Sequence, residues 1–358
     1  MRFPTKKLKD ISVIRTGKLD SNAAIQDGQY PFFTCDPQTL RIDEWAYDTE
    51  AVLLAGNNAS GNYTAKYYSG KFNAYQRTYI IETADESVLN VRFLCYALNQ
   101  QLKLLKTMSS GSTTKFLTIR MLHDLDIPLP DIDTQHKIVG VLGTIDDLIE
   151  NNQKQIKLLE EAAQRLYKEW FINFRFPGHE STPIVDGIPV GWQKVAVTDL
   201  LEIKYGKDHK SLPDGNVPAY GSGGIMRKVA SILRSGESVL IPRKGSLNNI
   251  MYVSGDFWTI DTMFYSVPRV PNIVKYTYLY LLGLDMYSFN IGAAVPSMTV
   301  KILDGISLLK PSEKVLTLFE NILSPLFARK EALKKQIETA GDIRDSLLSK
   351  LMTGEIVL

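Results

Sequence analysis

The sequence of 358 residues is poor in the residue types that bind metal ions or form disulfides. It has two cysteines, Cys35 and Cys95, and four histidines that show no ligand spacing. We therefore expect reduced, buried thiols and no zinc site. The longest apolar run, around residues 276–284, is too short to span a bilayer. The charged residues 1–10 lack the apolar core of a secretory signal, which predicts a cytoplasmic protein with no membrane contact.

Charge of one sign is also lacking, because 41 basic and 39 acidic residues leave a net charge of +2. The distribution is less even than the total. Between residues 204 and 244, eight basic residues stand against three acidic ones. Such a patch indicates a partner-binding surface or a solvated loop, and composition alone does not choose between them.

The strongest feature that is present is an internal repeat. KLKDISVIRTGK (7–18) matches KVAVTDLLEIKYGK (194–207), which aligns Gly17 with Gly206. AVLLAGNN (51–58) likewise matches SVLIPRKG (238–245). Two copies of one unit predict a molecule with pseudo-twofold symmetry.

Each copy begins with about 130 residues of mixed, strand-rich pattern. Short apolar runs at 52–55, 78–82 and 238–242 predict strands, and 91–106 and 274–287 predict helices. The pattern then changes to apolar residues spaced alternately by four and three, over 138–170 and again over 315–347. This heptad period predicts one long coiled-coil helix in each copy, with the other copy as its antiparallel partner.

The ends and the middle of these helices carry further signals. Asp133 and Ser312 are candidate N-caps, and Pro325 should kink the second helix or end a first short segment. Asn152 and Arg329 occupy the same heptad position in the two helices. They either fix the register of the pair or face a partner. At about 1.5 Å per residue, each rod is roughly 50 Å long.

Enzyme motifs are missing. No phosphate-binding loop, nucleophile elbow or amino-methyltransferase tetrapeptide occurs, and YGSGG (220–224) favours a turn. Glu202 and Lys204 have the Glu-x-Lys form of nuclease cores, with Asp186 or Asp199 upstream. The aligned segment of the first copy, 13–15, lacks the acid, so a solvated strand end is the preferred interpretation.

What remains is a binding architecture with two half-sites. Loops rich in Asn, Arg, Lys and Tyr can contact the phosphates and base edges of duplex DNA. Two pairs of aligned loops and the basic patch supply such residues. The candidate DNA-binding residues are Asn57, Asn58, Asn62, Tyr63, Lys66, Ser112, Thr113, Thr114, Lys115, Lys207, Arg227, Lys228, Arg243, Lys244, Ser246, Asn248, Asn249 and Ser297.

Four segments resemble one family, the specificity (S) subunits of Type I restriction-modification systems. They are KEWFINFRFPG (168–178), GIPVGW (187–192), LLSKLMTGEI (347–356) and the helix entrance IPLPDIDTQHKIV (127–139). The entrance departs from the family at Thr134, where Glu is usual, and KPSEKV (310–315) keeps Glu313 without the Gln. With the repeat, the resemblance covers essentially the whole chain.

The resemblance implies a non-catalytic subunit that reads a bipartite double-stranded DNA site. It also implies docking to two methyltransferase (M) subunits and, through them, to restriction (R) subunits. No cofactor is expected in this chain, and S-adenosylmethionine, ATP and Mg are expected on the partners. A standalone DNA nuclease and a coiled-coil scaffold that does not read DNA remain as alternatives. Candidate helix-pair or partner-binding residues are Asn152, Trp170, Phe171 and Arg329.

The predicted fold class is α+β: two pseudo-twofold-related α/β target-recognition domains joined by two long antiparallel coiled-coil helices. The helix pair would set the spacer between the half-sites. The expected boundaries are 1–131 for the first target-recognition domain, 132–173 for the first long helix, 174–192 for a linker, 193–311 for the second domain and 312–358 for the second long helix.

Overall fold

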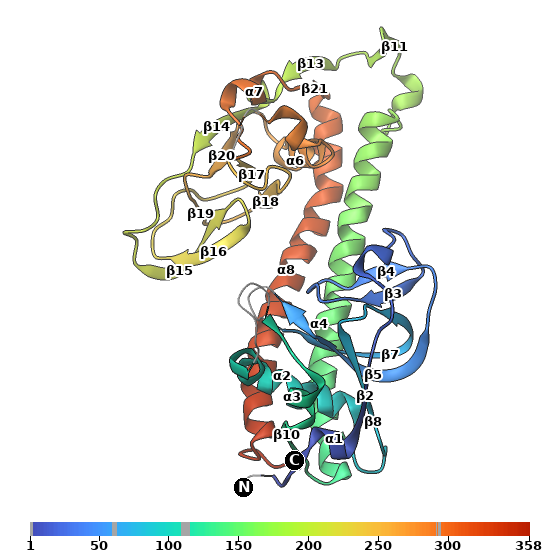
Figure 1. Ribbon diagram of the computed structural model, residues 1–358. Coiled ribbons are helices and arrows are strands. Elements are labelled where there is room, and N and C mark those ends of the chain that lie inside the picture. The colour runs from blue at the N-terminus through green and yellow to red at the C-terminus, as the bar shows by residue number, and fades with distance from the viewer. Residues whose placement is uncertain (1–2, 59–62, 109–114, 291, 293–294) are drawn as a thin grey trace. The chain divides into compact units, whose positions relative to one another are not determined.

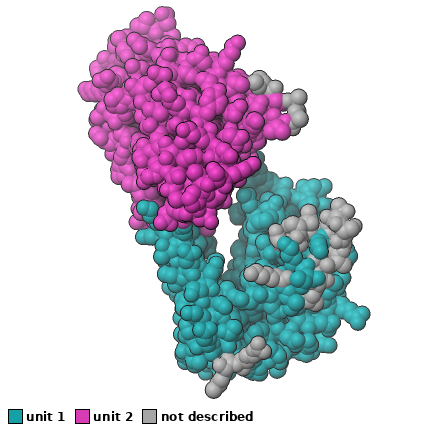
Figure 2. Space-filling model, turned by 90° about the vertical axis from the view of Figure 1, so that its left-hand side faces the viewer, with its two compact units in different colours: residues 1–152, 335–358 teal, residues 153–334 magenta. Residues whose placement is uncertain are grey.

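A computed structural model describes residues 3–58, 63–108, 115–290, 292 and 295–358 (Figure 1). The chain divides into two compact units, which Figure 2 shows in different colours. Unit 1 comprises residues 1–152 and 335–358, and unit 2 comprises residues 153–334. Each unit therefore contains a mixed α/β part and one segment of each of two long helices, in agreement with the predicted fold class.

Unit 1 is built on a six-stranded sheet in the order β2-β8-β5-β7-β3-β4, in which β3 and β7 are parallel and all other neighbours antiparallel. Val52 and Leu54 pack on one face of this sheet, and Ala51 and Leu53 on the other. Both faces are covered, which explains the continuous apolar run in β5. The strands are β2 (Ser12–Thr16), β3 (Tyr30–Phe33), β4 (Leu40–Ile42), β5 (Tyr47–Ala55), β7 (Ala65–Ala74) and β8 (Thr78–Thr83).

Short helices and two small ladders complete this part of unit 1. β1 pairs with β10, and β6 pairs with β9, each in antiparallel fashion. The bounds are β1 (Thr5–Lys7), α1 (Leu8–Ile11), β6 (Asn57–Asn58), α2 (Val91–Met108), β9 (Lys115–Phe116), α3 (Ile119–His123) and β10 (Asp126–Pro128).

Unit 2 repeats the same order of elements, but its sheet is split in two. One sheet has the order β14-β20-β17-β18 and the other β16-β15-β19. The counterpart of the long strand β7 is interrupted between β18 and β19, where Gly255 has a φ of 92° that leaves the strand conformation. The strands are β14 (Leu201–Tyr205), β15 (Asp214–Gly221), β16 (Gly224–Val229), β17 (Ser238–Pro242), β18 (Met251–Val253), β19 (Trp258–Thr259) and β20 (Met263–Pro268).

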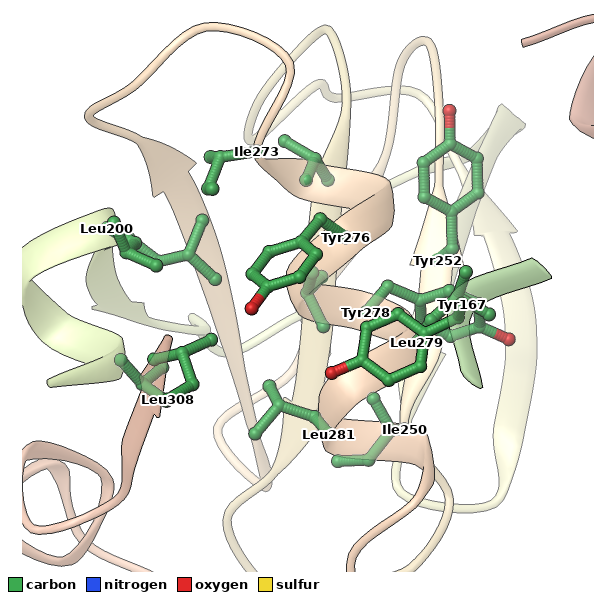
Figure 3. Close-up of a cluster of buried hydrophobic side chains, with 14 of the residues drawn as sticks. Tyr167, Leu200, Ile250, Tyr252, Ile273, Tyr276, Tyr278, Leu279, Leu281 and Leu308 are labelled. Atoms are coloured by element: carbon green, nitrogen blue, oxygen red, sulfur yellow. The ribbon is translucent and has the colours of Figure 1, made fainter. Parts of the chain in front are cut away.

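The core of unit 2 lies around α6, whose side chains Tyr276, Tyr278, Leu279 and Leu281 are buried (Figure 3). The helix ends at Leu282, so the expected helix over 274–287 is too long, and a 3-10 turn follows at Met286–Phe289. The remaining elements are β11 (Ile184–Val185), β12 (Ile188–Pro189), β13 (Gln193–Ala196), α5 (Val197–Leu200), α6 (Val274–Leu282), α7 (Val300–Asp304) and β21 (Ser307–Lys310).

The aligned glycines of the repeat occupy the same structural place. A Cβ atom on Gly17 would lie 2.1 Å from the carbonyl oxygen of Ala74, and one on Gly206 would lie 1.9 Å from that of Ile260. Both distances are far below van der Waals contact, so only glycine allows this approach of the two backbones. The repeat in the sequence is therefore a repeat of the fold.

The two long helices are α4 (Ile132–Tyr167), which continues into a π-helical turn at Lys168–Ile172, and α8 (Glu313–Met352). Asp131, and not Asp133, caps α4, because its carboxylate accepts a hydrogen bond from the backbone N–H of Thr134 at 2.8 Å. Ser312 directly precedes α8, as expected. Pro325 lies inside α8 at an exposed position, and the helix does not end there.

The helices pair antiparallel within each unit. In unit 1, residues 146 and 152 of α4 contact residues 344 and 336 of α8, so the numbers run in opposite directions. In unit 2, residues 160 and 170 contact 330 and 319 in the same opposed order.

The buried stripe of α8 follows the predicted positions at Val315, Phe319 and Leu333, but it is shifted by one residue between them. Ile322 and Arg329 are exposed, whereas Leu323 and Lys330 are buried. The reason is that this part of α8 also covers the core of unit 2, where Leu323 and Phe327 belong to the cluster around α6. No helix in the described part of the chain has the length and hydropathy needed to cross a membrane.

Candidate nucleic-acid interface

The two predicted loops of unit 1 meet in the structure. Asn57 pairs with Phe116 and Asn58 with Lys115 in the β6-β9 ladder, and the Leu117 N–H donates to the carbonyl of Gly56 at 2.8 Å. Segments about 60 residues apart in the sequence are thereby held side by side.

The two aligned loops of unit 2 meet in the same way. Lys244 forms an isolated bridge with Ser297, and the Met298 N–H donates to the carbonyl of Arg243 at 2.9 Å. Leu117 and Met298 therefore make equivalent bonds to Gly56 and Arg243. The sequence alignment predicts that the loops of one unit are equivalent to those of the other. It does not predict that the two loops within each unit pair with one another.

In each unit a tight turn also contacts the two paired loops. The turn at 75–78 joins β7 to β8, and the carbonyl of Arg77 accepts a hydrogen bond from the Gly56 N–H at 2.8 Å. In unit 2 the carbonyl of Thr262 accepts from the Arg243 N–H, also at 2.8 Å. We call residues 56–58, 75–78 and 115–117 loop junction 1, and residues 243–245, 260–263 and 296–298 loop junction 2.

Loop junction 1 borders a cleft of about 220 Å³. The Asn57 Oδ1 atom is buried and has no hydrogen-bond partner among the residues that the structure describes. Gln76 and Arg77 are exposed at the corner of the turn, and Phe116 is 41% exposed. The lining residues are Thr16, Gly56, Asn57, Gln76, Arg77, Tyr79, Phe116 and Leu117. Amides, a guanidinium and an aromatic ring are groups that read base edges.

Loop junction 2 carries its charge on Arg243. The guanidinium donates to the carbonyl of Asp261 at 3.2 Å and lies 5.3 Å from the ring centroid of Tyr205. These contacts hold a half-buried arginine in one orientation while leaving donors free for a ligand. Lys244 and Ser246 beside it are exposed.

Asn248 and Asn249, also predicted to bind DNA, fix the loop that follows. The Asn248 amide donates to Asp285 Oδ1 at 3.1 Å and accepts from the Met286 N–H at 2.7 Å. The Asn249 amide donates to the carbonyl of Ser222 at 2.8 Å. Part of the hydrogen-bonding capacity of these two side chains is therefore used within unit 2.

Other predicted residues are also engaged in the fold. Tyr63 is 4% exposed and packs in the core of unit 1, away from solvent. Lys66 donates to the carbonyl of Asp36 and to Thr39, and burial lowers its pKa. Arg227 donates hydrogen bonds to the carbonyl of Leu212 and to the carboxylate of Asp214.

Two predicted residues of the basic patch, Lys207 and Lys228, are exposed. Asn62, Ser112, Thr113 and Thr114 lie outside the described residues, as does the side chain of Asn58.

The helix-pair candidates separate into two kinds. Asn152 is 2% exposed and donates to Gln336, whereas Arg329 is exposed and donates to Gln155 at 3.1 Å. Trp170 and Phe171 are buried in unit 2, where both rings contact Phe319. These two aromatic residues therefore anchor the end of α4 in the core.

Three of the four residues of the nuclease alternative are partnered within unit 2, and the fourth, Asp186, is exposed in a turn. Glu202 and Lys204 form an ion pair at 2.5 Å on β14, and the Lys204 hydrogen bond lowers the pKa of Glu202. Asp199 accepts a hydrogen bond from the Ala196 N–H at the start of α5. Across the described ranges, no group of three or more His, Cys, Asp or Glu side chains is placed to hold a metal ion.

Sequence reasoning did not select Gln76, Arg77 or Phe116. Gln76 and Arg77 lie between the apolar runs of β7 and β8, where the second copy has Asp261 and Thr262. This correspondence between the copies was the signal in the sequence that could have pointed to them, since they belong to no binding motif.

Comparison with known proteins gives a consistent result. Residues 2–161 match the family described as Type I restriction modification DNA specificity domain. The chain is 37% identical over 176 residues to the Type I restriction enzyme EcoDI specificity subunit of Escherichia coli, covering 49% of this chain and 38% of that protein. It is 28% identical over 292 residues to the Type I restriction enzyme MjaIX specificity subunit of Methanocaldococcus jannaschii, covering 70% and 65%.

A solved structure matches over nearly the full length. The crystal structure of the Type I restriction-modification system S subunit from M. genitalium aligns with a TM-score of 0.67 and 20% identity, over 98% of this chain and 96% of that chain. The fold is therefore shared. The two sequence relatives are each matched over less than two thirds of their own length.

Proposed function

We propose that the chain is a DNA specificity subunit of the Type I restriction-modification family and that it selects the DNA site on which such a complex acts. The proposal is supported by the family match over residues 2–161 and by the similarity to two specificity subunits. Each unit reads one half of a bipartite duplex site. The two halves differ in sequence because the two units present different side chains at equivalent places.

The observation that carries this proposal is the pair of loop junctions. The same backbone pairing occurs twice, yet Gly56, Arg77 and Phe116 in one copy correspond to Arg243, Thr262 and Ser297 in the other. A backbone frame that occurs twice with different side chains is what two half-sites of different sequence require. Base edges are distinguished by side-chain donors and acceptors, whereas phosphates are held without regard to sequence.

The helix pair supplies the second part of the proposal. α4 and α8 have 36 and 40 residues, which at 1.5 Å per residue gives about 54 and 60 Å. We assign to this pair the spacing between the half-sites and the docking of partner subunits. The buried pairing of polar residues within each unit, such as Lys330 with Glu160, fixes one register for the two helices.

The chain itself is assigned no catalytic step. Methyl transfer to adenine belongs to two methyltransferase subunits with S-adenosylmethionine, and DNA cleavage belongs to restriction subunits with ATP and Mg. The engagement of Glu202 by Lys204 supports this division, since a nuclease core would hold these groups ready for metal and phosphate. The assembled complex acts on DNA in the cytoplasm.

The test is the adenine methylome of the source cell with and without the gene, combined with capture of partners by the tagged chain. Loss of one gapped, bipartite motif on deletion, with a methyltransferase subunit captured, is the expected result. An unchanged methylome together with no captured methyltransferase would overturn the proposal. Metal-dependent cleavage by the isolated chain would instead favour a nuclease.

A further inference from the structure

The two loop junctions each contain one arginine, but it lies on a different segment in each. In unit 1 the end of β5 carries Gly56 and the turn carries Arg77. In unit 2 the end of β17 carries Arg243 and the turn carries Thr262. The same backbone hydrogen bond thus joins two equivalent residues in each unit, Gly56 to Arg77 and Arg243 to Thr262. In each unit only one of these two residues has a cationic side chain.

The geometry of Gly56 explains why the arginine of unit 1 is on the turn. A Cβ atom at Gly56 would lie 2.4 Å from the carbonyl oxygen of Arg77 and 3.0 Å from the ring of Tyr79. No side chain fits there without moving the turn. In unit 2, where Phe264 takes the place of Tyr79 in the sheet, Arg243 occupies the same position.

Arg77 is exposed, and its guanidinium makes no hydrogen bond or ion pair within the described part of the chain. It borders the cleft of unit 1 together with Asn57, Gln76 and Phe116. Three other arginines of the unit are bonded within it: Arg15 pairs with Glu82, Arg41 with the carbonyl of Gly28, and Arg92 with Asp147. Arg120 on α3 is exposed and likewise has no hydrogen bond or ion pair among the described residues, but it does not line the cleft. The place of Arg77 in the cleft, beside the buried and unpartnered Oδ1 of Asn57, therefore marks it as the arginine available to a ligand.

We infer that Arg77 reads a guanine in the half-site bound by unit 1, as the counterpart of Arg243 in the half-site bound by unit 2. This inference rests on the proposed function. Arginine donates two parallel hydrogen bonds to N7 and O6 of guanine in the major groove, which no other base accepts in that pattern. Each half-site therefore contains one guanine opposite its loop junction, although the two arginines are not aligned in the sequence.

A phosphate contact is the competing role for Arg77. A lysine satisfies a phosphate as a point charge, but it cannot reproduce the planar fork that matches guanine. The substitution Arg77→Lys therefore separates the two roles without changing charge, and its exposed position leaves the core intact. Lys9→Ala is the matched control, because Lys9 is exposed on α1, at the opposite end of β2 from the cleft.

The experiment uses the full chain in complex with its methyltransferase subunits. The wild-type site is first read from the methylome, and duplexes with each of the four bases at each position of both half-sites then compete for the complex at low salt. Arg77→Lys should lower discrimination for guanine at one position of one half-site by about 5- to 150-fold, the equivalent of 1–3 kcal/mol. Arg243→Lys should do so in the other half-site, and Lys9→Ala in neither.

Two results would overturn the inference. One is unchanged discrimination at every position with Arg77→Lys, and the other is an equal loss of affinity for all duplexes. A wild-type complex that prefers no gapped site would instead contradict the proposed function, so the two failures are distinguishable.

Discussion

Asn152 of α4 donates a hydrogen bond from its side-chain amide to Oε1 of Gln336 in α8, at 3.2 Å. These are non-apolar residues within the heptad stripes of the two helices, and the structure brings them together. The Asn152 side chain is buried, while Gln336 is exposed. We expect the pair to fix the register of α4 and α8 in unit 1.

Replacing Asn152 by leucine should therefore raise stability. The variant buries an apolar side chain, and water satisfies the exposed Gln336, so the free energy of unfolding should increase by about 0.5–1.5 kcal/mol. Gln336→Ala is the matched variant, which leaves the buried amide without its partner and should cost about 1–2 kcal/mol. Urea unfolding measures both. A large loss of stability in Asn152→Leu, together with loss of the methyltransferase partner, would show a partner-facing role.

A second prediction concerns Lys275, which is 2% exposed and lies 2.5 Å from carboxylate oxygens of both Glu237 and Glu320. Lys275→Met removes the cation and leaves the carboxylates facing each other, and should cost about 3–5 kcal/mol. The triple variant with Glu237→Gln and Glu320→Gln should recover most of this loss. Thermal unfolding measures both, with the exposed Lys301→Met as control. A loss below about 1 kcal/mol would mean that the triad contributes little.

The stability of unit 1 should fall at alkaline pH through Cys95. Burial raises the pKa of this thiol to about 12, and an unfolded thiol ionises near pH 8.5. Below pH 8.5 the Cys95 thiol is protonated in both the native and the unfolded state, so its contribution to the free energy of unfolding is fully present. Between the two pKa values the native state binds more protons than the unfolded state, so the free energy of unfolding falls by about 1.4 kcal/mol per pH unit.

The measurement is urea unfolding of wild type and Cys95→Ala between pH 7 and pH 10. The variant should lose part of the alkaline slope whatever its stability at pH 7. Cys35→Ala is the variant for comparison, because the Cys35 thiol is only partly buried, although burial raises its pKa too. Identical slopes in wild type and Cys95→Ala would contradict the prediction.

Tyr205 should act on DNA recognition through Arg243, whose guanidinium lies 5.3 Å from its ring centroid. Tyr205→Ala removes the ring that orients the arginine, and should lower discrimination in the second half-site by about 0.5–1 kcal/mol. Arg243→Ala should cost more, about 1–3 kcal/mol. Tyr205→Phe keeps the ring and should behave as wild type in competition binding. Equal effects of Tyr205→Phe and Tyr205→Ala would indicate a role for the hydroxyl instead.

Lengthening both helices by one heptad, at the level of Asn152 and Gln336, should lengthen the spacer. Seven residues add about 10 Å, which is about three base pairs of duplex. The half-sites should keep their letters, since no residue of either loop junction changes. Methylome sequencing reads both quantities at once, and altered half-site letters would count against the helix pair as the spacer.

The sequence predicts the architecture well, because the repeat and the heptad pattern are long-range signals repeated over many residues. It fails where one helix faces two neighbours. The stripe through Ile322 and Arg329 follows ideal heptads, but α8 must also cover the core around α6, and this turns Leu323 and Lys330 inward. A heptad pattern predicts the face of a helix that packs on one partner helix. It does not predict a second face that packs on a domain core.

The candidate site is less predictable than the fold. Loop composition selects Arg243, but it also selects Tyr63, which is a core residue, and Arg227, which holds the carbonyl of Leu212. It misses Arg77, because a single arginine in a tight turn has no pattern of its own. Only the pairing of loops distant in the sequence shows which side chains share a surface, and these individual DNA contacts remain predictions.

Unit 1 is made of two separate stretches of chain, and all of unit 2 lies between them. Leu351 and Met352, from the second stretch, are buried in the core of unit 1. During synthesis the ribosome therefore completes every residue of unit 2 before it makes the segment that closes the core of unit 1. The domain that is begun first is the last to be finished, and until then its apolar surface beside Ile138 and Leu142 stays open to chaperones and proteases.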